Sequence, residues 1–524
     1  MLKRHNGFTI VELLIVIVVI GILAAITIIS FNGVARKATD AVLKNDASNL
    51  ATNLGLYLAT NNDQYVGWFS GNPAPAGTNF KVSGDNYADI VTSADQKQYC
   101  IRVFNAKSSY TSAASAYTLE QPVGACVQLT ASDNAIAAVP PTSGWRSMSD
   151  HCGIRYDGKG YCWGDNSAGG LGNGTNVNSN NPTPITMSGV LAGKTFNSIS
   201  GTCAIASDNN AYCWGTGGYG SLGNGTTSNS NVPVAVSTSG VLLGKTIKSL
   251  SSSGSTTCVI ASDNNAYCWG YNFAGGVGDG TTNNISSPVA VINTGVLSGK
   301  TINSISVGFY QTCAIASDNN AYCWGDNNFG TLGNGNTNSY TGPVAVQTSG
   351  ALAGKTLKSL SVSTLRAACA IASDSNAYCW GFNGYTALGN GTSTNSSVPL
   401  PVIATGALAG KTVKSIASAS SSFCVIASDS NGYCWGENTY GGLANGTTAS
   451  NSNVPVSILN SGMLGGKSLK AIGGGGSTIC SIASDDTAYC WGNTGAGQNF
   501  GNSSMYVTVS GNSYANQPVL VPQP

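Results

Sequence analysis

Charged residues are scarce in this chain. Its 524 residues include 23 Lys or Arg and 22 Asp or Glu, which is 9% of the total, against roughly 25% in an average soluble domain. The net charge is only +1, so the chain lacks the basic surface that attracts nucleic acids or acidic membranes. We therefore expect no nucleic-acid partner.

Histidine and glutamate are rarer still. The chain has two histidines, His5 and His151, and three glutamates, Glu12, Glu120 and Glu437. A mechanism that uses a histidine base, a histidine metal cluster or a pair of glutamates has almost no residues to draw on. We predict that the protein is not an enzyme, with no catalytic residues, no metal site and no cofactor.

Glycine and cysteine, in contrast, are plentiful. The 68 glycines, with many Asn, Ser and Thr in the later part of the chain, are typical of turn-rich β structure. The 16 cysteines are even in number and regularly paired, which favours disulfides formed outside the reducing cytosol; buried free thiols are the alternative. The predicted pairs are Cys100–Cys126, Cys152–Cys162, Cys203–Cys213, Cys258–Cys268, Cys313–Cys323, Cys369–Cys379, Cys424–Cys434 and Cys480–Cys490.

The N-terminal segment predicts a single membrane span. A short basic leader with Lys3 and Arg4 is followed by an apolar run that continues to Phe31. About 20 apolar residues in a helix cross a bilayer, and the basic leader keeps the N-terminus in the cytoplasm. A secretory signal peptide would instead have a shorter apolar core followed by a cleavage site.

Glu12 is an unusual residue within this apolar run. A lone carboxylate in a membrane helix is costly unless it is paired. It lies one helical turn after Phe8, whose amine becomes a positive charge if the leader is cut after Gly7. The alternative is an ordinary anchor whose glutamate lies near the lipid headgroups.

The string GFTIVELLIVIVVIGILAAI closely resembles the N-terminus of type IV prepilins and related pseudopilins. The resemblance implies that a prepilin peptidase cuts after Gly7 and that the new N-terminal residue, Phe8, is methylated. It also implies that Glu12 neutralises a neighbouring subunit's N-terminus in a filament. The expected partners are therefore other pilin subunits, through the N-terminal helix, and the peptidase. The expected location is the cytoplasmic (inner) membrane, then the cell surface or an extracellular filament.

From Trp145 onward the chain is periodic. Seven Cys-Trp-Gly triplets recur at steps of 51 to 56 residues, and each repeat holds four candidate strands. This pattern predicts a seven-bladed β-propeller rather than a helical solenoid. Trp145–Ser149 and Pro518–Val521 are the expected closing strands.

The fold class is thus mainly β: a long pilin helix with a small α+β head, then the propeller. The head resembles a pilin globular domain, and we expect Cys100 and Cys126 to bridge it. The predicted parts are a leader (1–7), a transmembrane and filament helix (8–60), the head (61–128), a linker (129–144) and the propeller (145–524).

Most repeated residues have structural interpretations. A Ser-Asp-Asn-Asn turn could place each repeated cysteine pair opposite one another on antiparallel strands, within disulfide reach. The tryptophan of each triplet is expected to pack between blades.

Six Gly-x-x-x-Gly-Lys segments are one residue too short between the glycines for a phosphate loop. We interpret their lysines as surface residues between blades, or alternatively as a weak basic ring: Lys194, Lys245, Lys300, Lys355, Lys411 and Lys467.

The segment WGDNNFGTLGNG resembles the signature of the regulator-of-chromosome-condensation repeat family, a seven-bladed propeller group. The signature drifts in the third, sixth and above all the seventh repeat. That family includes guanine-nucleotide exchange factors and a secreted β-lactamase inhibitor. An exported, disulfide-rich and nearly uncharged chain is more similar to the secreted binding members.

Aromatic residues in the variable loops after Trp-Gly are the candidate binding residues, because loops on a rigid scaffold often carry binding sites. The alternative is that they pack beneath the next glycine turn. The candidates are Tyr219, Tyr271, Phe273, Phe329, Tyr385 and Tyr440.

Our leading hypothesis is a minor or tip pilin-like subunit that displays the propeller for adhesion to an extracellular protein or glycan. A surface-anchored inhibitor or decoy of an extracellular enzyme, and a pseudopilin of a secretion system, are the alternatives.

Overall fold

The computed structural model describes residues 144–448, 450–495, 507–509 and 512–522, and four strands nearer the N-terminus. For those four strands, and for residues 494–495, 507–509 and 512–513, only the backbone is described. The chain divides into two compact units, Met1–Pro141 and Thr142–Pro524. The predicted leader and filament helix, and the linker up to residue 143, lie outside the described residues.

The first unit contains a four-stranded antiparallel sheet in the order β1-β2-β3-β4. The strands are β1 (Trp68–Phe69), β2 (Asn86–Thr92), β3 (Tyr99–Asn105) and β4 (Ser115–Leu119). All four strands lie within residues 61–128, the range predicted for the head. Cys100 lies on β3 opposite Thr118 of β4, but Cys126, its predicted partner, is outside the described residues.

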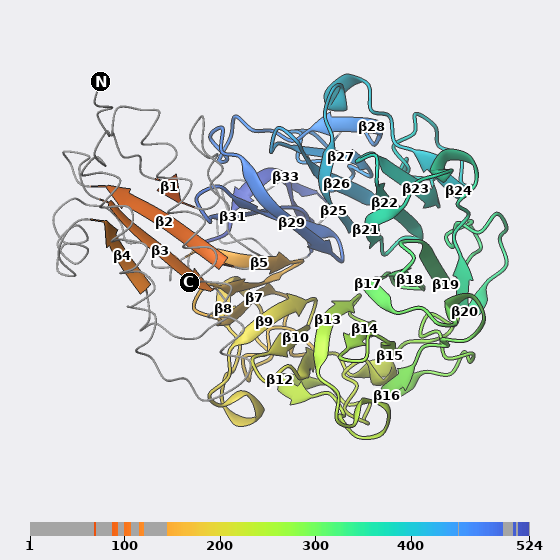
Figure 1. Ribbon diagram of the computed structural model, residues 1–524, viewed down its shortest axis with the longest axis horizontal. Helices are drawn as coiled ribbons and strands as arrows, with labels where there is room; N and C mark the ends of the chain where they lie inside the picture. Colours follow the sequence, from red (N-terminus) through yellow and green to blue (C-terminus); the bar gives the residue numbers. More distant parts are fainter. Residues whose placement is uncertain are drawn as a thin grey trace, which may run out of the picture. The chain divides into compact units, whose positions relative to one another are not determined.

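The second unit is a ring of seven antiparallel sheets, or blades (Figure 1). The first six blades have four strands each, in sequence order, and the seventh has five. This confirms the seven-bladed propeller.

The blades follow one another along the chain. Blade 1 holds β5 (Trp145–Ser149), β6 (Cys152–Arg155), β7 (Gly160–Gly164) and β8 (Ser179–Pro184). Blade 2 holds β9 (Phe196–Ser200), β10 (Cys203–Ala206), β11 (Ala211–Gly215) and β12 (Ser230–Ala235). Blade 3 holds β13 (Ile247–Ser252), β14 (Thr256–Ala261), β15 (Ala266–Gly270) and β16 (Ile285–Ala290). Blade 4 holds β17 (Ile302–Val307), β18 (Gln311–Ala316), β19 (Ala321–Gly325) and β20 (Tyr340–Ala345).

The remaining three blades complete the ring. Blade 5 holds β21 (Leu357–Val362), β22 (Ala367–Ala372), β23 (Ala377–Gly381) and β24 (Ser396–Pro401). Blade 6 holds β25 (Val413–Ala419), β26 (Ser422–Ala427), β27 (Gly432–Gly436) and β28 (Ser452–Ser457). Blade 7 holds β29 (Leu469–Gly475), β30 (Thr478–Ala483), β31 (Ala488–Gly495), β33 (Asn512–Leu520) and β32 (Val507–Val509).

The core lies between the blades rather than in one central cluster. The second strands read Cys-Ala-Ile-Ala or a close variant, and in blades 2 to 6 every residue of the second and third strands is buried. A strand covered on both faces reads as a nearly continuous apolar run. The first strands of neighbouring blades contact one another around the centre of the ring.

The two predicted closing strands both form, but they do not share a sheet. β5 is the first strand of blade 1 and pairs with β6, whereas β33 pairs with β31 and β32 of blade 7. The ring closes by packing β5 against β29 and β30. The Trp145 backbone N–H donates to the Asp486 carbonyl at 3.0 Å across this seam, and Tyr156 Oη donates to Asp486 Oδ1 at 3.1 Å.

The antiparallel order gives the propeller two distinct faces. Strand direction alternates, so the connections between first and second strands, and between third and fourth strands, emerge on one face. We call this the loop face. The turns between second and third strands, and the linkers between blades, emerge on the opposite face, which we call the turn face.

Candidate functional site

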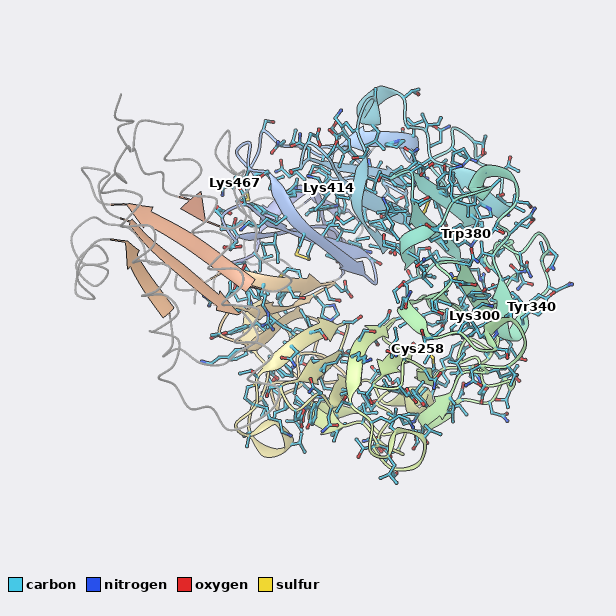
Figure 2. All side chains as sticks on the ribbon, viewed as in Figure 1. Cys258, Lys300, Tyr340, Trp380, Lys414 and Lys467 are labelled. Atoms are coloured by element: carbon cyan, nitrogen blue, oxygen red, sulfur yellow. A yellow bond between two sulfur atoms is a disulfide. The ribbon has the colours of Figure 1, made fainter. Side chains whose placement is uncertain are left out.

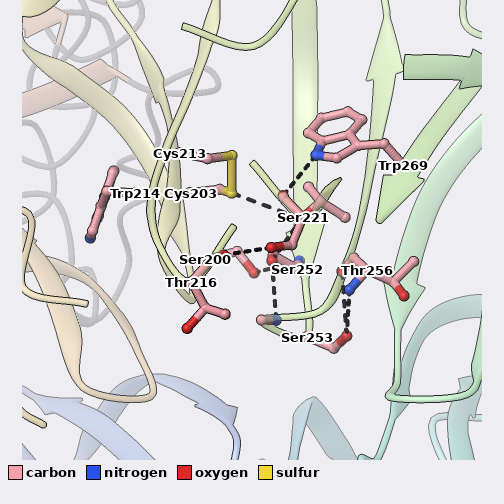
Figure 3. Close-up of a disulfide and its surroundings, with 12 residues drawn as sticks. Ser200, Cys203, Cys213, Trp214, Thr216, Ser221, Ser252, Ser253, Thr256 and Trp269 are labelled. Atoms are coloured by element: carbon pink, nitrogen blue, oxygen red, sulfur yellow. Dashed lines mark hydrogen bonds between the residues drawn. A yellow bond between two sulfur atoms is a disulfide. The ribbon is translucent and has the colours of Figure 1, made fainter. Parts of the chain in front are cut away.

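The seven repeated cysteine pairs are disulfides that join the second and third strands of each blade. Cys203 and Cys213, for example, are directly opposite in register, with Cα atoms 4.1 Å apart (Figure 3). The other six pairs have Cα–Cα distances of 4.0 to 4.1 Å. Seven of the eight predicted bridges are thus confirmed, because the hairpin turn brings cysteines ten residues apart into opposite positions.

The repeated tryptophans pack between blades, as predicted. Trp269 donates its indole N–H to the Ser221 carbonyl of the preceding blade at 3.0 Å (Figure 3), and Trp324 donates to Gly276 at 2.9 Å. Gly223 has φ +65, and a Cβ there would lie 2.6 Å from Trp269 Nε1. The glycine of the Leu-Gly-Asn-Gly signature is therefore required by the neighbouring blade's tryptophan.

On the turn face, each of the six repeated lysines joins an aspartate and a tyrosine of the following blade. Lys194 Nζ lies 2.9 Å from Asp208 Oδ2 and 2.6 Å from Tyr212 Oη, and Tyr212 Oη donates to Asp208 Oδ2 at 2.7 Å. Lys300 pairs in the same way with Asp318 of blade 4, and Lys467 pairs with Asp485 of blade 7. Both lysines are labelled in Figure 2. The lysines are surface residues at the blade linkers, as predicted. The alternative of a basic ring is wrong, because every one of the six is paired with a carboxylate.

These contacts shift the pKa values of the turn residues. Burial alone would raise the pKa of Asp208, but hydrogen bonds from Tyr212 and Lys194 outweigh it and lower that pKa to about 2. Burial, together with the hydrogen bond to Asp263, raises the pKa of Tyr267 to about 12. The turn face therefore holds ionised aspartates and neutral tyrosines over a wide pH range.

A buried asparagine organises the loop after the third strand. Asn327 is 0% exposed; its Nδ2 donates to the Asn336 carbonyl at 3.0 Å, and its Oδ1 accepts from the Leu332 N–H at 2.8 Å. Sequence reasoning missed this residue, although a Trp-Gly-x-Asn pattern marks it in five repeats. The equivalent residues are Asn166, Asn272, Asn383 and Asn438.

Five aromatic rings of blades 2, 3 and 4 contact one another on the loop face. Tyr271 is at the centre, and its ring centroid lies 4.9 Å from that of Tyr219 and 6.3 Å from that of Phe273. It also lies 5.7 Å from Phe309 and 6.2 Å from Tyr310. Loops from three blades thus meet at one tyrosine.

A second group of rings joins blades 4 and 5. The centroid of Phe382 lies 4.9 Å from Phe329 and 5.8 Å from Tyr385. The Arg366 guanidinium connects the two groups, since its Cζ lies 4.4 Å from the Tyr310 centroid and 5.4 Å from that of Phe329. We call these eight rings and Arg366 the aromatic surface.

Arg366 is held in place by an ion pair between blades. Its Nε lies 2.8 Å from Asp326 Oδ2, and the Asp326 side chain is only 6% exposed. The Asn328 side chain donates to Asp326 Oδ1 at 2.6 Å. Sequence reasoning missed Arg366, but it is the single arginine in the sequence after Arg155, and this isolation in so repetitive a chain was an available signal.

The structure places five of the six predicted binding residues in the aromatic surface and one outside it. Tyr440 lies 6.4 Å from Tyr514 of blade 7, between ring centroids, and is half-buried. Its ring contact is therefore with blade 7 and not with the aromatic surface. The five that the structure brings together are Tyr219, Tyr271, Phe273, Phe329 and Tyr385.

In the part of the chain that the structure describes, no three or more His, Cys, Asp or Glu side chains gather as a metal site would need. Within the same residues no helix has the length and apolar character of a membrane span. The predicted span lies outside them.

Three family models match the sequence. The model described as a prokaryotic N-terminal methylation motif matches residues 2–28. Two models, each described as a regulator of chromosome condensation (RCC1) repeat, match residues 157–199, 208–260, 318–362 and 374–426, and residues 247–275 and 302–331. The seventh blade, where the repeat signature drifts most, lies outside the matched ranges.

Curated relatives share the repeat region. The chain is 29% identical to the Arabidopsis thaliana ultraviolet-B receptor UVR8 over 252 residues, which is 48% of this chain and 55% of that protein. It is 26% identical to the human E3 ubiquitin-protein ligase HERC2 over 330 residues, 62% of this chain and 7% of HERC2. The chain thus spans about half of one relative and a small part of the other.

Solved structures show the same fold. Prp20p from Saccharomyces cerevisiae has a TM-score of 0.56 at 16% identity, covering 73% of this chain and 88% of that one. Human WBSCR16 has a TM-score of 0.53 at 16% identity, covering 65% and 85%. The chain therefore carries a prepilin-type N-terminal methylation motif fused to a seven-bladed propeller of the RCC1 repeat type. Such a motif is typical of a secreted or pilus-type protein.

Proposed function

We propose that this protein is a type IV pilin-like subunit, minor or at the filament tip, that displays its propeller for adhesion or another extracellular binding function. The observation that carries the proposal is the fusion itself, since a methylation motif at residues 2–28 precedes a separate, disulfide-linked unit, Thr142–Pro524. Disulfides persist in oxidising compartments, which agrees with export.

The proposed assembly uses the N-terminal segment. A prepilin peptidase cuts after Gly7, Phe8 is methylated, and Glu12 pairs with the N-terminus of a neighbouring pilin subunit. Before assembly the chain crosses the inner membrane once, with its N-terminus in the cytoplasm. A propeller larger than an ordinary pilin head would crowd a close-packed filament, and this supports a minor or tip position.

The binding part of the proposal is supported by exposed aromatic side chains on the loop face. Tyr219 is 55% exposed and Phe273 is 72% exposed, and both belong to loops that vary between blades. Exposed aromatic anchors on a rigid scaffold are typical of binding surfaces. We propose no catalytic step.

The direct test removes the propeller from the native gene. A chain that ends at residue 144 should still be processed and inserted, and filaments should still form, but cells should no longer attach to their surface or host. A Gly7 substitution is the matched control, since it should block processing while the propeller is still made. Attachment that is unchanged without residues 145–524 would contradict the proposal.

A pull-down with the full chain separates adhesion from inhibition. Capture of a glycan, or of many different surface molecules, supports adhesion. Capture of one extracellular enzyme, with loss of that enzyme's activity, would instead identify an inhibitor.

A further inference from the structure

The aromatic surface spans four of the seven blades, and its most prominent rings project from the loops. Phe273, Tyr219 and Tyr385 are 72%, 55% and 39% exposed. The three come from blades 3, 2 and 5, and they are connected through half-buried rings and the Arg366 guanidinium. Among the residues whose side chains the structure describes, these three are the exposed aromatic ones.

The rings present several orientations. Neighbouring planes meet at 59° between Tyr219 and Tyr271 and at 75° between Phe382 and Tyr385, while Tyr271 and Phe273 are stacked at 15°. Such a surface is stepped, and it offers ring faces as well as edges to a ligand. The face of an aromatic ring carries partial negative charge and attracts polarised C–H groups.

The charges of this surface compensate one another. Arg366 is already paired with the buried Asp326. Asp279, the other charged residue in the loop-face connections of blades 2 to 5, accepts hydrogen bonds from the Thr281 N–H and hydroxyl. A nucleic acid or an acidic glycan would meet two carboxylates and one arginine whose charge is compensated, so an anionic ligand is disfavoured.

The rings are surrounded by amide and hydroxyl groups. The loops that carry them are rich in Asn, Ser, Thr and Gly, and Tyr219, Tyr271 and Tyr385 add phenolic hydroxyl groups. These groups donate and accept hydrogen bonds without charge. An apolar peptide would not use them, and a peptide anchor fills a desolvated pocket, whereas Phe273 projects from the surface.

We propose that the aromatic surface is a binding site for an uncharged glycan, whose C–H faces stack on the projecting rings and whose hydroxyls bind the surrounding polar groups. This deepens the proposed function, on which it rests, by naming the ligand class and the site. Arg366 is a positioning residue: it comes from blade 5, lies between Tyr310 and Phe329 of blade 4, and holds the two groups of rings in one surface.

The experiment uses the full chain, purified in detergent, on an array that carries neutral oligosaccharides (glucans, mannans and galactans), sialylated and uronate-bearing glycans, and proline-rich peptides. We expect binding to at least one neutral glycan and weaker or no binding to the acidic forms. Raising NaCl tenfold should change the affinity by less than about twofold, because the proposed ligand carries no charge to be screened.

The key variant is the double substitution Tyr219→Ala with Phe273→Ala. It should weaken binding by about tenfold or more, since each stacked ring contributes roughly 1 kcal/mol. Two exposed apolar residues outside the surface provide controls: Val177→Ala, 72% exposed on the loop face of blade 1, and Leu243→Ala, 75% exposed on the turn face. Both controls should bind within about twofold of the parent. Thermal unfolding of all the variants should match the parent, because none of the substituted side chains is buried.

Several results would overturn the glycan site. These are an array with no neutral glycan bound, binding to acidic glycans or peptides alone, or full binding by the double variant. Cells that carry the double variant and still attach, while cells without residues 145–524 do not, would refute this site and leave the proposed function standing. If both strains still attach, the proposed function itself is refuted.

Discussion

The turn face and the loop face of the propeller differ in how strictly they repeat. On the turn face, a lysine pairs with an aspartate of the following blade six times, from Lys194 with Asp208 to Lys467 with Asp485. In blades 2 to 6 a tyrosine hydroxyl also donates to that aspartate. On the loop face, the residue after Trp-Gly is Asp326 in blade 4, Tyr271 in blade 3 and Phe382 in blade 5. The turn-face residues recur from blade to blade, whereas the loop-face residues differ between blades.

The difference reflects two kinds of physical demand. Every blade must join its linker to its hairpin turn, so residues that meet this demand recur in each repeat. A ligand on one side of a ring touches only some blades, so residues that serve it need not recur. The loop face has its own repeated support, the buried asparagine of which Asn327 is an example, and the variable rings are built on it.

The largest effect we expect is from a disulfide, which lies between the two faces. Replacing both cysteines of Cys313–Cys323 with alanine should lower the free energy of unfolding by about 3 kcal/mol, because the unfolded chain loses a short closed loop. Binding by the folded protein should be unchanged. Urea denaturation under oxidising conditions measures the stability, with the reduced parent as a reference. Unchanged stability would contradict the prediction.

A turn-face substitution should affect stability alone. Asp318 accepts from Tyr322 Oη at 2.7 Å and from the Asn320 N–H at 3.1 Å. Asp318→Ala removes both hydrogen bonds and should cost about 2 kcal/mol. Asp318→Asn keeps the acceptor for the turn N–H and should cost less. If the alanine variant binds glycan less tightly at a temperature where it is fully folded, the turn face also contributes to binding, and the prediction is wrong.

The pH dependence of stability should also come from the turn face. The pKa of Asp208 is lowered to about 2 in the folded state, so its contribution is full above pH 4 and is lost as the pH falls toward 2. The pKa values of Tyr267 and Tyr433 are raised to about 12, so their contribution is full below pH 10 and is lost as the pH rises toward 12. Urea midpoints measured from pH 2 to pH 12 test both limits.

Tyrosine variants provide the matched control for the alkaline limit. Tyr267→Phe and Tyr433→Phe lack the ionising hydroxyl, so each should reduce the loss of stability between pH 10 and pH 12. An alkaline loss that is the same in parent and variants would show that other groups control it.

The smallest effect on stability should come from the loop face. Arg366→Lys keeps a charge for Asp326 but loses the planar contacts with Tyr310 and Phe329, and it should change stability by less than about 1 kcal/mol. Glycan binding should nevertheless fall severalfold. Lys300→Arg is the turn-face counterpart and should leave binding unchanged. Equal glycan binding by Arg366→Lys and the parent would contradict the positioning role of Arg366.

Local spacing explains why much of the fold could be predicted. The ten-residue separation of Cys258 and Cys268 spans one hairpin, so the pairing followed from the turn and the alternation of a strand. The tryptophan contacts could be predicted as interblade packing because Trp-Gly recurs once per blade. The way in which β5 and β33 close the ring could not be predicted, since either a shared sheet or side-by-side packing fits the same strand pattern.

The candidate site was only partly predictable. Exposed aromatics such as Tyr385 could be named from their place in variable loops, but Tyr440 occupies the equivalent position in its repeat and packs on Tyr514 instead. Arg366 and Asp326 are forty residues apart in the sequence, and no local pattern links them. Whether a loop aromatic is exposed depends on the neighbouring blade, which local sequence does not describe.

The sequence alone determined the number of blades, the strands and disulfides within each, and the prepilin-type motif at the N-terminus, because all of these depend on residues close together in the chain. Only the tertiary structure decided which loops meet on the ring and which lysines are neutralised. It also decided that one arginine unites the rings of four blades. These contacts join residues from different blades, and their distances are fixed by the closure of the ring.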